Sequence, residues 1–244
     1  MNTLHIGRPP SPPDPRGLPG RWFATSAVLL WLTGIMSIGL WHARMPSLAD
    51  QHVTSWLQSP RISKVLVDLE LSVLWTKPGL TTMAALGGPS ALIAAMLCVL
   101  TLSWWRRDAV LGALALIGPV LAGAITEWIG KPLVDRRIDG VHPSFPSGHV
   151  TTAAAIAALL WVAARRTSRS PLRALAPIVW AIPAIVSVAV LRLGWHVATD
   201  AIAGVGVGMG VVFGSLAALT TISMLWTPAA GPRVTPPPGS TRLR

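Results

Sequence analysis

A chain of 244 residues that is 52% hydrophobic and only 12% charged does not have the composition of a soluble domain, in which about 25% of residues are charged. The net charge of +11 does not indicate nucleic-acid binding, because the basic residues form short clusters between apolar runs. The single cysteine, Cys98, excludes an intramolecular disulfide and a cysteine-based zinc site. Apolar runs of roughly 20 residues recur, each long enough to cross a bilayer, so we expect a polytopic membrane protein.

The two ends of the chain are polar and rich in proline. Residues 1–20 and 227–244 contain too few apolar side chains to bury a core, so we expect both to be disordered tails. Residues 21–226 are expected to form one membrane domain. The predicted fold class is therefore all-α, a bundle of transmembrane helices between two polar tails.

Six transmembrane helices are expected, at about residues 22–41, 82–104, 109–128, 150–164, 175–193 and 201–226. Prolines inside three of these spans predict kinks, which neighbouring helices in a bundle tolerate. The last span carries a row of glycines, which predicts close helix packing rather than phosphate binding. These glycines are Gly204, Gly206, Gly208 and Gly210.

The longest connection between two spans covers residues 42–80. Within it, the stretch RISKVLVDLELSVLW spaces its apolar residues in a helical period, which predicts an amphipathic helix lying at the membrane interface. The apolar positions are Ile62, Val65, Leu66, Leu69 and Val73. A seventh short span is the weaker alternative, because it would place Asp68 and Glu70 in hydrocarbon.

The distribution of lysine and arginine predicts the orientation. Most of the 20 lysines and arginines lie in the segments on the same side as the two termini. The bias grows when Lys131, Arg136, Arg137 and Arg192 are set aside as candidate site residues. Because positive residues favour the cytoplasmic side, we expect both termini to be cytoplasmic and the connections near residues 131–149 and 192–200 to be extracytoplasmic.

The informative polar residues gather at these two extracytoplasmic connections. His196 and Asp200 are four residues apart, so on a helix the carboxylate can hold one imidazole nitrogen and raise the basicity of the other. Arg192 projects to the same side if the helix is continuous. Ser147 precedes the fourth span, where free backbone N–H groups at a helix start suit an anion.

Two histidines with an acid and nearby cations suit phosphoryl transfer. Lys131, Arg136 and Arg137 add positive charge that can balance phosphoryl oxygens. One histidine can attack phosphorus while the other protonates the leaving group. His149 and His196 are the candidates for these two tasks.

Three segments in order, KPLVDRR, PSGH and HVATD, resemble the type-2 phosphatidic acid phosphatase superfamily. That family includes bacterial undecaprenyl pyrophosphate phosphatases, lipid phosphate phosphatases and soluble acid phosphatases, and it shares its site with vanadium haloperoxidases. The motifs cover residues 131–200, and the six-span layout extends the resemblance to about residues 22–226. The resemblance implies an acid-phosphatase/vanadium-haloperoxidase-like helical core.

The resemblance also implies a role for each matching residue. His196 corresponds to the family's nucleophile and Asp200 to the acid that orients it. His149 corresponds to the histidine that protonates the leaving group, while Ser147 and Gly148 help to hold the phosphate. The PSGH motif is complete in this chain.

The arginine of the first motif departs from the family's pattern. After this lysine and six intervening residues the family has Arg-Pro, whereas this chain has Ile138 and Asp139. Arg136 and Arg137 stand two and one residues early. The resemblance implies that one of them contacts the phosphate, and it favours Arg136.

The arginine of the third motif is also displaced. The family's Ser-Arg pair falls on Ala189 and Val190, and Arg192 stands two residues late. That shift moves a helical side chain by about 160°, but four residues before His196 it still lies on the histidine's side. Arg192 is therefore kept as a candidate phosphate ligand.

The sequence predicts a metal-independent membrane phosphatase that hydrolyses a phosphate monoester or pyrophosphate on a lipid, through a phosphohistidine, at the extracytoplasmic surface. A polyprenyl pyrophosphate is the first expected substrate. A phosphatidic acid or phosphatidylglycerophosphate-like lipid comes second, and a phosphorylated glycolipid remains open. We expect an integral protein of a bacterial plasma membrane that contacts lipid and uses no cofactor, nucleic acid or obligatory protein partner.

Several alternatives stay open. The displaced arginines suggest a lipid phosphotransferase or a catalytically weak member that binds lipid phosphate. A transporter would need ionisable residues at mid-span, whereas here they stand at span ends. The His196–Asp200 pair can also be purely structural, and Glu127 is expected to form a helix-end ion pair with Lys131. A metal site lacks a known zinc spacing and would draw on His142, His149, His196 and Asp200.

Overall fold

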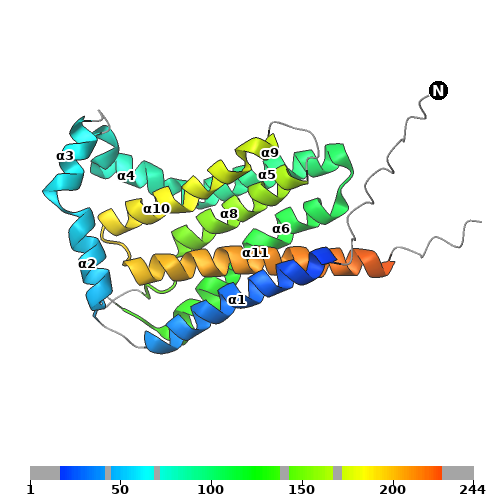
Figure 1. The fold of residues 1–244 in the computed structure, drawn as a ribbon, viewed down its shortest axis with the longest axis horizontal. Helices are drawn as coiled ribbons and strands as arrows, with labels where there is room; N and C mark the ends of the chain where they lie inside the picture. Colours follow the sequence, from blue (N-terminus) through cyan, green and yellow to red (C-terminus); the bar gives the residue numbers. More distant parts are fainter. Residues whose placement is uncertain (1–16, 42–44, 69–71, 138–142, 167–171, 227–244) are drawn as a thin grey trace, which may run out of the picture.

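The computed structural model describes residues 17–41, 45–68, 72–137, 143–166 and 172–226. All regular secondary structure within these ranges is helical, which confirms the all-α fold class. The predicted tails lie outside the described residues, apart from residues 17–20, which already belong to the first helix, α1 (Gly17–Gly39). The long helices lie side by side in an elongated bundle (Figure 1).

Within the described residues, five helices are long and apolar enough to cross a membrane, namely Pro19–Gly39 in α1, Pro89–Arg106 (α5), Ala109–Val134 (α6 to α7), Gly148–Arg165 (α8) and Ala198–Trp226 (α11). The remaining expected span corresponds to a shorter apolar helix, Ala176–Arg192. It consists of a 3-10 turn, η4 (Ala176–Trp180), and α10 (Ala181–Arg192). The count of six therefore stays a prediction.

The long helices carry apolar side chains on both their inner and outer faces. Inside, Leu114 of α6, Leu159 of α8 and Val212 of α11 are fully buried in one core cluster. Outside, Leu97 of α5 and Val120 of α6 are more than half exposed. A helix that is apolar on all sides suits a bundle surrounded by hydrocarbon.

Helix α11 lies at the centre of the bundle, because it packs against α1, α6 and α8. Its glycines make this possible, as the sequence predicted. A Cβ added to Gly208 would meet the carbonyl oxygen of Thr151 and lie 2.8 Å from the Cβ of Ala154, both on α8. On another face, Gly210 approaches α1, where the hydroxyl of Ser26 donates to its carbonyl oxygen at 2.7 Å.

Replacing Gly208 with alanine is expected to destabilise the folded protein by about 1–3 kcal/mol, because the new methyl group collides with the backbone of α8. The midpoint of thermal unfolding in detergent would measure the loss. Gly34→Ala on α1 is the matched control, since nothing lies within 4 Å of its added Cβ. Equal midpoints for the two variants would contradict the close α8–α11 contact.

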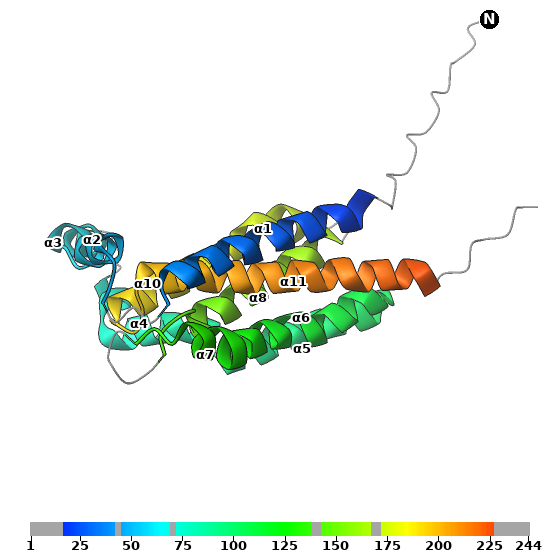
Figure 2. The same cartoon turned by 90° about the horizontal axis from the view of Figure 1, so that it is seen from below.

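The segment between α1 and α5 contains more structure than the sequence predicted. It forms α2 (Leu48–Leu57), α3 (Pro60–Asp68), η1 (Ser72–Trp75), α4 (Lys77–Ala84) and η2 (Ala85–Gly87). The stretch expected as one amphipathic helix contains α3 and η1, and residues 69–71 between them lie outside the described part of the chain. Helices α2 and α3 lie beyond one end of the long helices (Figure 2).

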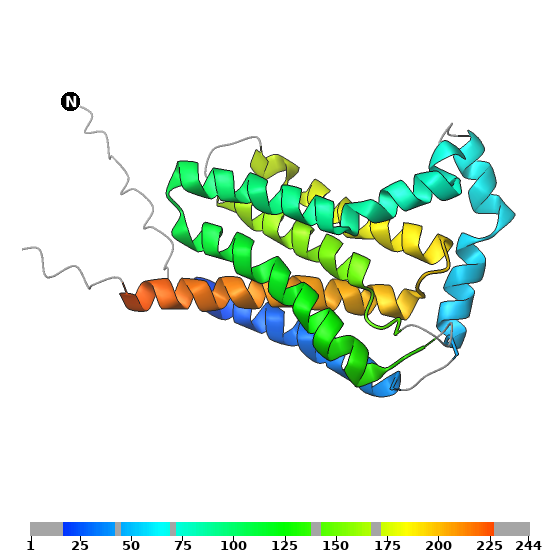
Figure 3. The same cartoon turned by 180° about the vertical axis from the view of Figure 1, so that it is seen from behind.

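The two ends of the bundle differ. The beginning of α1 and the end of α11 lie together at one end, whereas α2 and the beginnings of α8 and α11 lie at the other (Figures 1 and 3). The third long helix also reaches this second end. There α6 (Ala109–Ile125) continues through a π-helical turn (Thr126–Gly130) into α7 (Lys131–Val134), and such turns occur often at functional sites.

Candidate active site

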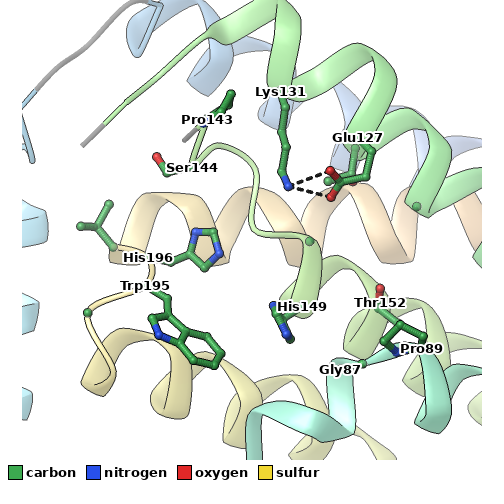
Figure 4. Close-up of a pocket in the computed structure, with 16 residues that line it drawn as sticks. Gly87, Pro89, Glu127, Lys131, Pro143, Ser144, His149, Thr152, Trp195 and His196 are labelled. Atoms are coloured by element: carbon green, nitrogen blue, oxygen red, sulfur yellow. Dashed lines mark hydrogen bonds and ion pairs between the residues drawn. The ribbon is translucent and has the colours of Figure 1, made fainter. Parts of the chain in front are cut away.

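A pocket of about 650 Å³ opens at the end of the bundle that carries α2. Four segments line it, and all three predicted motifs contribute to it (Figure 4). The pocket lining includes Glu127, Lys131, Gly148, His149, Trp195 and His196. The side chains of His149, His196 and Lys131 point toward the same space, although they are far apart in sequence.

The start of α8 holds His149 in the pocket. Ser147 is the N-cap, with extended backbone angles, and its hydroxyl accepts from the N–H of Val150 at 3.5 Å. Ser147 is fully buried, and its own N–H donates to the carbonyl oxygen of Asp200 at 3.0 Å. This bond joins the beginnings of α8 and α11, so the two histidine-bearing segments are fixed side by side.

A tight turn between α10 and α11 presents His196. Gly194 has a φ of +72°, a left-handed conformation that glycine adopts without steric cost. His196 follows this turn and precedes α11, so its ring is held at the helix entrance. Its Nδ1 lies 3.5 Å from Oδ2 of Asp200, a fully buried residue in the first turn of α11. That separation is longer than a standard hydrogen bond.

The ion pair expected between Glu127 and Lys131 is confirmed. Nζ of Lys131 donates to both carboxylate oxygens, at 2.7 and 2.8 Å. The pair lies at the pocket wall, and an added Cβ on Gly148 would lie 2.8 Å from the Glu127 carboxylate. Because no arginine is among the residues that line the pocket within the described chain, Lys131 supplies its positive charge.

Arg136 points away from the pocket, which differs from the phosphate contact expected for it. Its guanidinium is fully buried and donates to Oδ1 of Asp200 at 2.8 Å, to Oδ2 of Asp50 at 3.0 Å and to the Thr199 hydroxyl at 2.6 Å. Arg137 is also outside the pocket lining and pairs with Asp135 at 2.6 Å. Arg136 therefore pairs with two buried carboxylates, Asp50 and Asp200, and does not line the pocket.

Arg192 was expected on the side of His196, and the structure corrects this. The expectation required a continuous helix, but α10 ends at Arg192 and the chain turns at Gly194. The guanidinium instead donates to the carbonyl oxygen of Leu57 at 3.1 Å and lies 4.9 Å from the ring centre of Trp75. Arg192 thus contacts α2 and η1, in the segment between α1 and α5, and does not line the pocket.

Sequence reasoning missed Asp50, although its capping box with Ser47 is a recognisable helix-start signal. Burial by itself raises the pKa of Asp50, but bonds from Thr199, Ser47 and Arg136 outweigh it and hold the pKa below its ordinary 3.8. The carboxylate therefore stabilises the fold fully above that ordinary value. Its contribution is lost as the pH falls through the lower folded-state pKa.

Sequence reasoning also missed Trp195 as a pocket residue. Its ring centre lies 5.5 Å from that of His149, so it covers one side of the proposed proton donor. Its neighbour His196 was the available signal. No group of three or more His, Cys, Asp or Glu side chains is positioned to hold a metal ion among the described residues, and His142 lies outside them.

The long apolar helices are those of a membrane protein, and the pocket that holds two histidines lies at one end of their bundle. The PAP2 superfamily model matches residues 118–224, a range that contains all three motifs. This match to part of the chain confirms the resemblance to the type-2 phosphatidic acid phosphatase superfamily.

The fold is similar to that of a solved membrane protein, described as the first transmembrane PAP2 type phosphatidylglycerolphosphate phosphatase from Bacillus subtilis. The TM-score is 0.50 and the sequence identity 17%, and the match covers 84% of this chain and 98% of that chain. At this identity the similarity establishes the membrane PAP2 fold alone. A comparison with curated proteins finds no match.

Proposed function

We propose that the protein is a lipid phosphatase that releases inorganic phosphate from a phosphate monoester or pyrophosphate on a lipid. The observation that carries this proposal is that His149, His196 and Lys131 line one pocket while Asp200 backs His196. A nucleophile with an orienting acid, a separate proton donor and a fixed cation are the groups that phosphoryl transfer needs.

In the first step, His196 attacks phosphorus through Nε2, because its Nδ1 faces Asp200. A P–N bond forms and the P–O bond to the lipid breaks. The departing oxygen takes a proton from His149, so a lipid alcohol leaves, or a lipid monophosphate if the substrate is a pyrophosphate. The product on the protein is a phosphohistidine. Oδ2 of Asp200 faces Nδ1 of His196 throughout the step.

In the second step, water replaces the histidine at phosphorus. His149, now neutral, takes a proton from the water as its oxygen attacks, and the P–N bond breaks to release phosphate. Lys131 and the free backbone N–H groups at the start of α8, beside Gly148, hold the phosphoryl oxygens. Arg136, Arg137 and Arg192 are not assigned to the phosphate, because their side chains do not line the pocket.

The substrate is proposed to be a lipid, because the pocket lies at the end of an apolar bundle where a head group meets the membrane surface. A polyprenyl pyrophosphate remains first, and a phosphatidic acid or phosphatidylglycerophosphate-like lipid second. The fold match to a phosphatidylglycerolphosphate phosphatase supports including that lipid in any test.

A substrate panel in detergent micelles tests the proposal, with phosphate release as the readout and His196→Ala as the blank. Polyprenyl pyrophosphate, phosphatidic acid, phosphatidylglycerophosphate and a phosphorylated glycolipid form the panel. Wild type is expected to exceed the blank by about 10³-fold or more for at least one lipid class. Equal release by both proteins with every lipid would overturn the phosphatase proposal.

One observation favours a second candidate, a lipid-phosphate-binding protein or phosphotransferase. Lys131, the cation of the described pocket, is already paired with Glu127, so the positive charge available to a phosphate is small. A transferase would move labelled phosphate to a lipid acceptor without releasing it to water. Analysis of both products in the same panel separates transfer, hydrolysis and simple binding.

The proposed site is extracytoplasmic and both termini cytoplasmic, supported by the bias of lysine and arginine. Single cysteines at positions 140 and 168, in a Cys98→Ala background, test this in intact cells. A membrane-impermeant maleimide is expected to label position 140 and not position 168. The reverse pattern would invert the orientation.

A further inference from the structure

A second network of charges lies behind the pocket, outside the residues that line it. One member of this network is Asp50 on α2, a fully buried carboxylate. Oδ1 accepts from the N–H of Thr199 at 2.9 Å, and Oδ2 accepts from Arg136 at 3.0 Å and from the Thr199 hydroxyl at 3.1 Å. Ser47 completes the shell through its N–H at 3.1 Å and its hydroxyl at 2.8 Å.

Arg136 connects this carboxylate to the one behind the proposed nucleophile. One terminal nitrogen, Nη2, contacts Asp50, while the other, Nη1, contacts Oδ1 of Asp200 at 2.8 Å. The other oxygen of Asp200 accepts from the N–H of Val197 at 3.3 Å and faces His196. The guanidinium is thus shared between two carboxylates, and each carboxylate accepts from one of its two terminal nitrogens.

We propose that Asp50 is a positioning residue for phosphoryl transfer, which holds Arg136 and Thr199 so that Asp200 presents Oδ2 to His196. This inference rests on the proposed function. It brings α2, from the segment between the first two long helices, into the machinery of a site whose motifs all lie beyond residue 130.

The charges explain how Asp50 acts. With Asp50 present, the network of two carboxylates and one guanidinium carries a net negative charge beside His196. Without that carboxylate, the whole guanidinium turns to Asp200, because Arg favours two-nitrogen pairing with one carboxylate. Asp200 would then rotate from His196 and support its positive charge less.

A purely structural role for Asp50 accounts less well for this arrangement. Helix α2 already docks through an apolar residue, since its other buried side chain is Leu57, which packs in the cluster with α10. Burying a charge network rarely stabilises a protein more than apolar packing does. We therefore infer that Asp50, in the first turn of α2, contributes to the reaction and not only to the docking of this helix.

The test replaces Asp50 with asparagine, which keeps the shape and removes the charge, in a wild type shown to release phosphate above the His196→Ala blank. We expect kcat to fall by about 10–100-fold with KM changed less than about threefold. We also expect the acidic limb of the kcat/KM profile to move to lower pH, because the variant removes a negative charge from the network behind the pocket. The other charged groups facing His196, namely His149, Lys131, Glu127 and Asp200, are unchanged.

Asp108→Asn is the control, because Asp108 pairs with Arg166 outside the pocket lining and is expected to leave kcat and the pH profile unchanged. If Asp50→Asn unfolds in detergent, Thr199→Val replaces it, since it removes only the hydroxyl shared by Arg136 and Asp50. That variant is expected to lose kcat by about 3–10-fold at constant KM. Active wild type with an unchanged kcat and pH profile in the folded variant overturns the inference. No release by wild type instead overturns the proposed function.

Discussion

Replacing His149 with glutamine is expected to lower kcat for an alkyl phosphate such as phosphatidic acid by about 10²–10⁴-fold, because an alkoxide leaves slowly without a proton donor. An activated aryl phosphate should behave differently, since its leaving group needs no proton. With that ester the variant is expected to give a fast stoichiometric burst of aryl alcohol. Slow turnover is expected to follow, because His149 is also proposed to activate the water of the second step.

Rapid-mixing measurement of aryl alcohol and phosphate separates the two steps of this reaction. Thr152→Val is the control, because Thr152 also lines the pocket on α8 but has no part in the proposed proton transfers. It is expected to leave the first-turnover rate within about threefold of wild type. A His149→Gln variant that loses the same factor in the first turnover for alkyl and aryl esters would show that His149 is not the acid.

Opposite effects are expected from the two partners of the ion pair at the pocket wall. Lys131→Met should lower kcat/KM by about 10²–10³-fold. The substitution removes the ammonium group that, among the described pocket residues, would stabilise the phosphoryl oxygens. Glu127→Gln should lower KM by up to about fivefold, because phosphate no longer competes with a carboxylate for Nζ. Steady-state kinetics on the best lipid of the panel measures both changes.

These two variants also provide a check on each other. If Glu127 serves to position Lys131, Glu127→Gln would raise KM, and the competition argument would be wrong. The double variant is then informative, because Glu127→Gln should have no effect on KM once Lys131 is methionine. Inorganic phosphate as a competitive inhibitor gives the same comparison without a lipid substrate.

The fold could be predicted from the sequence wherever long apolar runs dominate. Five of the expected spans appear among the described residues as helices long enough to cross a membrane, with ends up to seven residues from the predicted ones. The glycine row of α11 also behaved as predicted, because small residues permit close approach regardless of what surrounds them. Helix α2 was missed, because its ten residues carry a mixed polar pattern that resembles a loop.

The candidate site was predicted less evenly. Residues that lie at a helix start or four apart on one turn could be placed, so His149, Asp200 and the Glu127–Lys131 pair were found. Arginine positions could not be placed. Arg192 depended on whether a helix continued through Gly194, and Arg136 depended on Asp50, which is 86 residues away in sequence.

The N–H of Ser147 and the glycines of α11 together limit which positions of this protein can be substituted without disturbing the pocket. Main-chain contacts set the separation between α8, which carries His149, and α11, which follows His196, so no exchange of side chains near the pocket can change it gradually. We therefore expect variation that alters substrate choice to fall on pocket walls from other segments, such as residues 87–89. We expect a library randomised there to yield altered lipid preference with intact chemistry, whereas one randomised at Gly204 and Gly208 yields mostly unfolded protein.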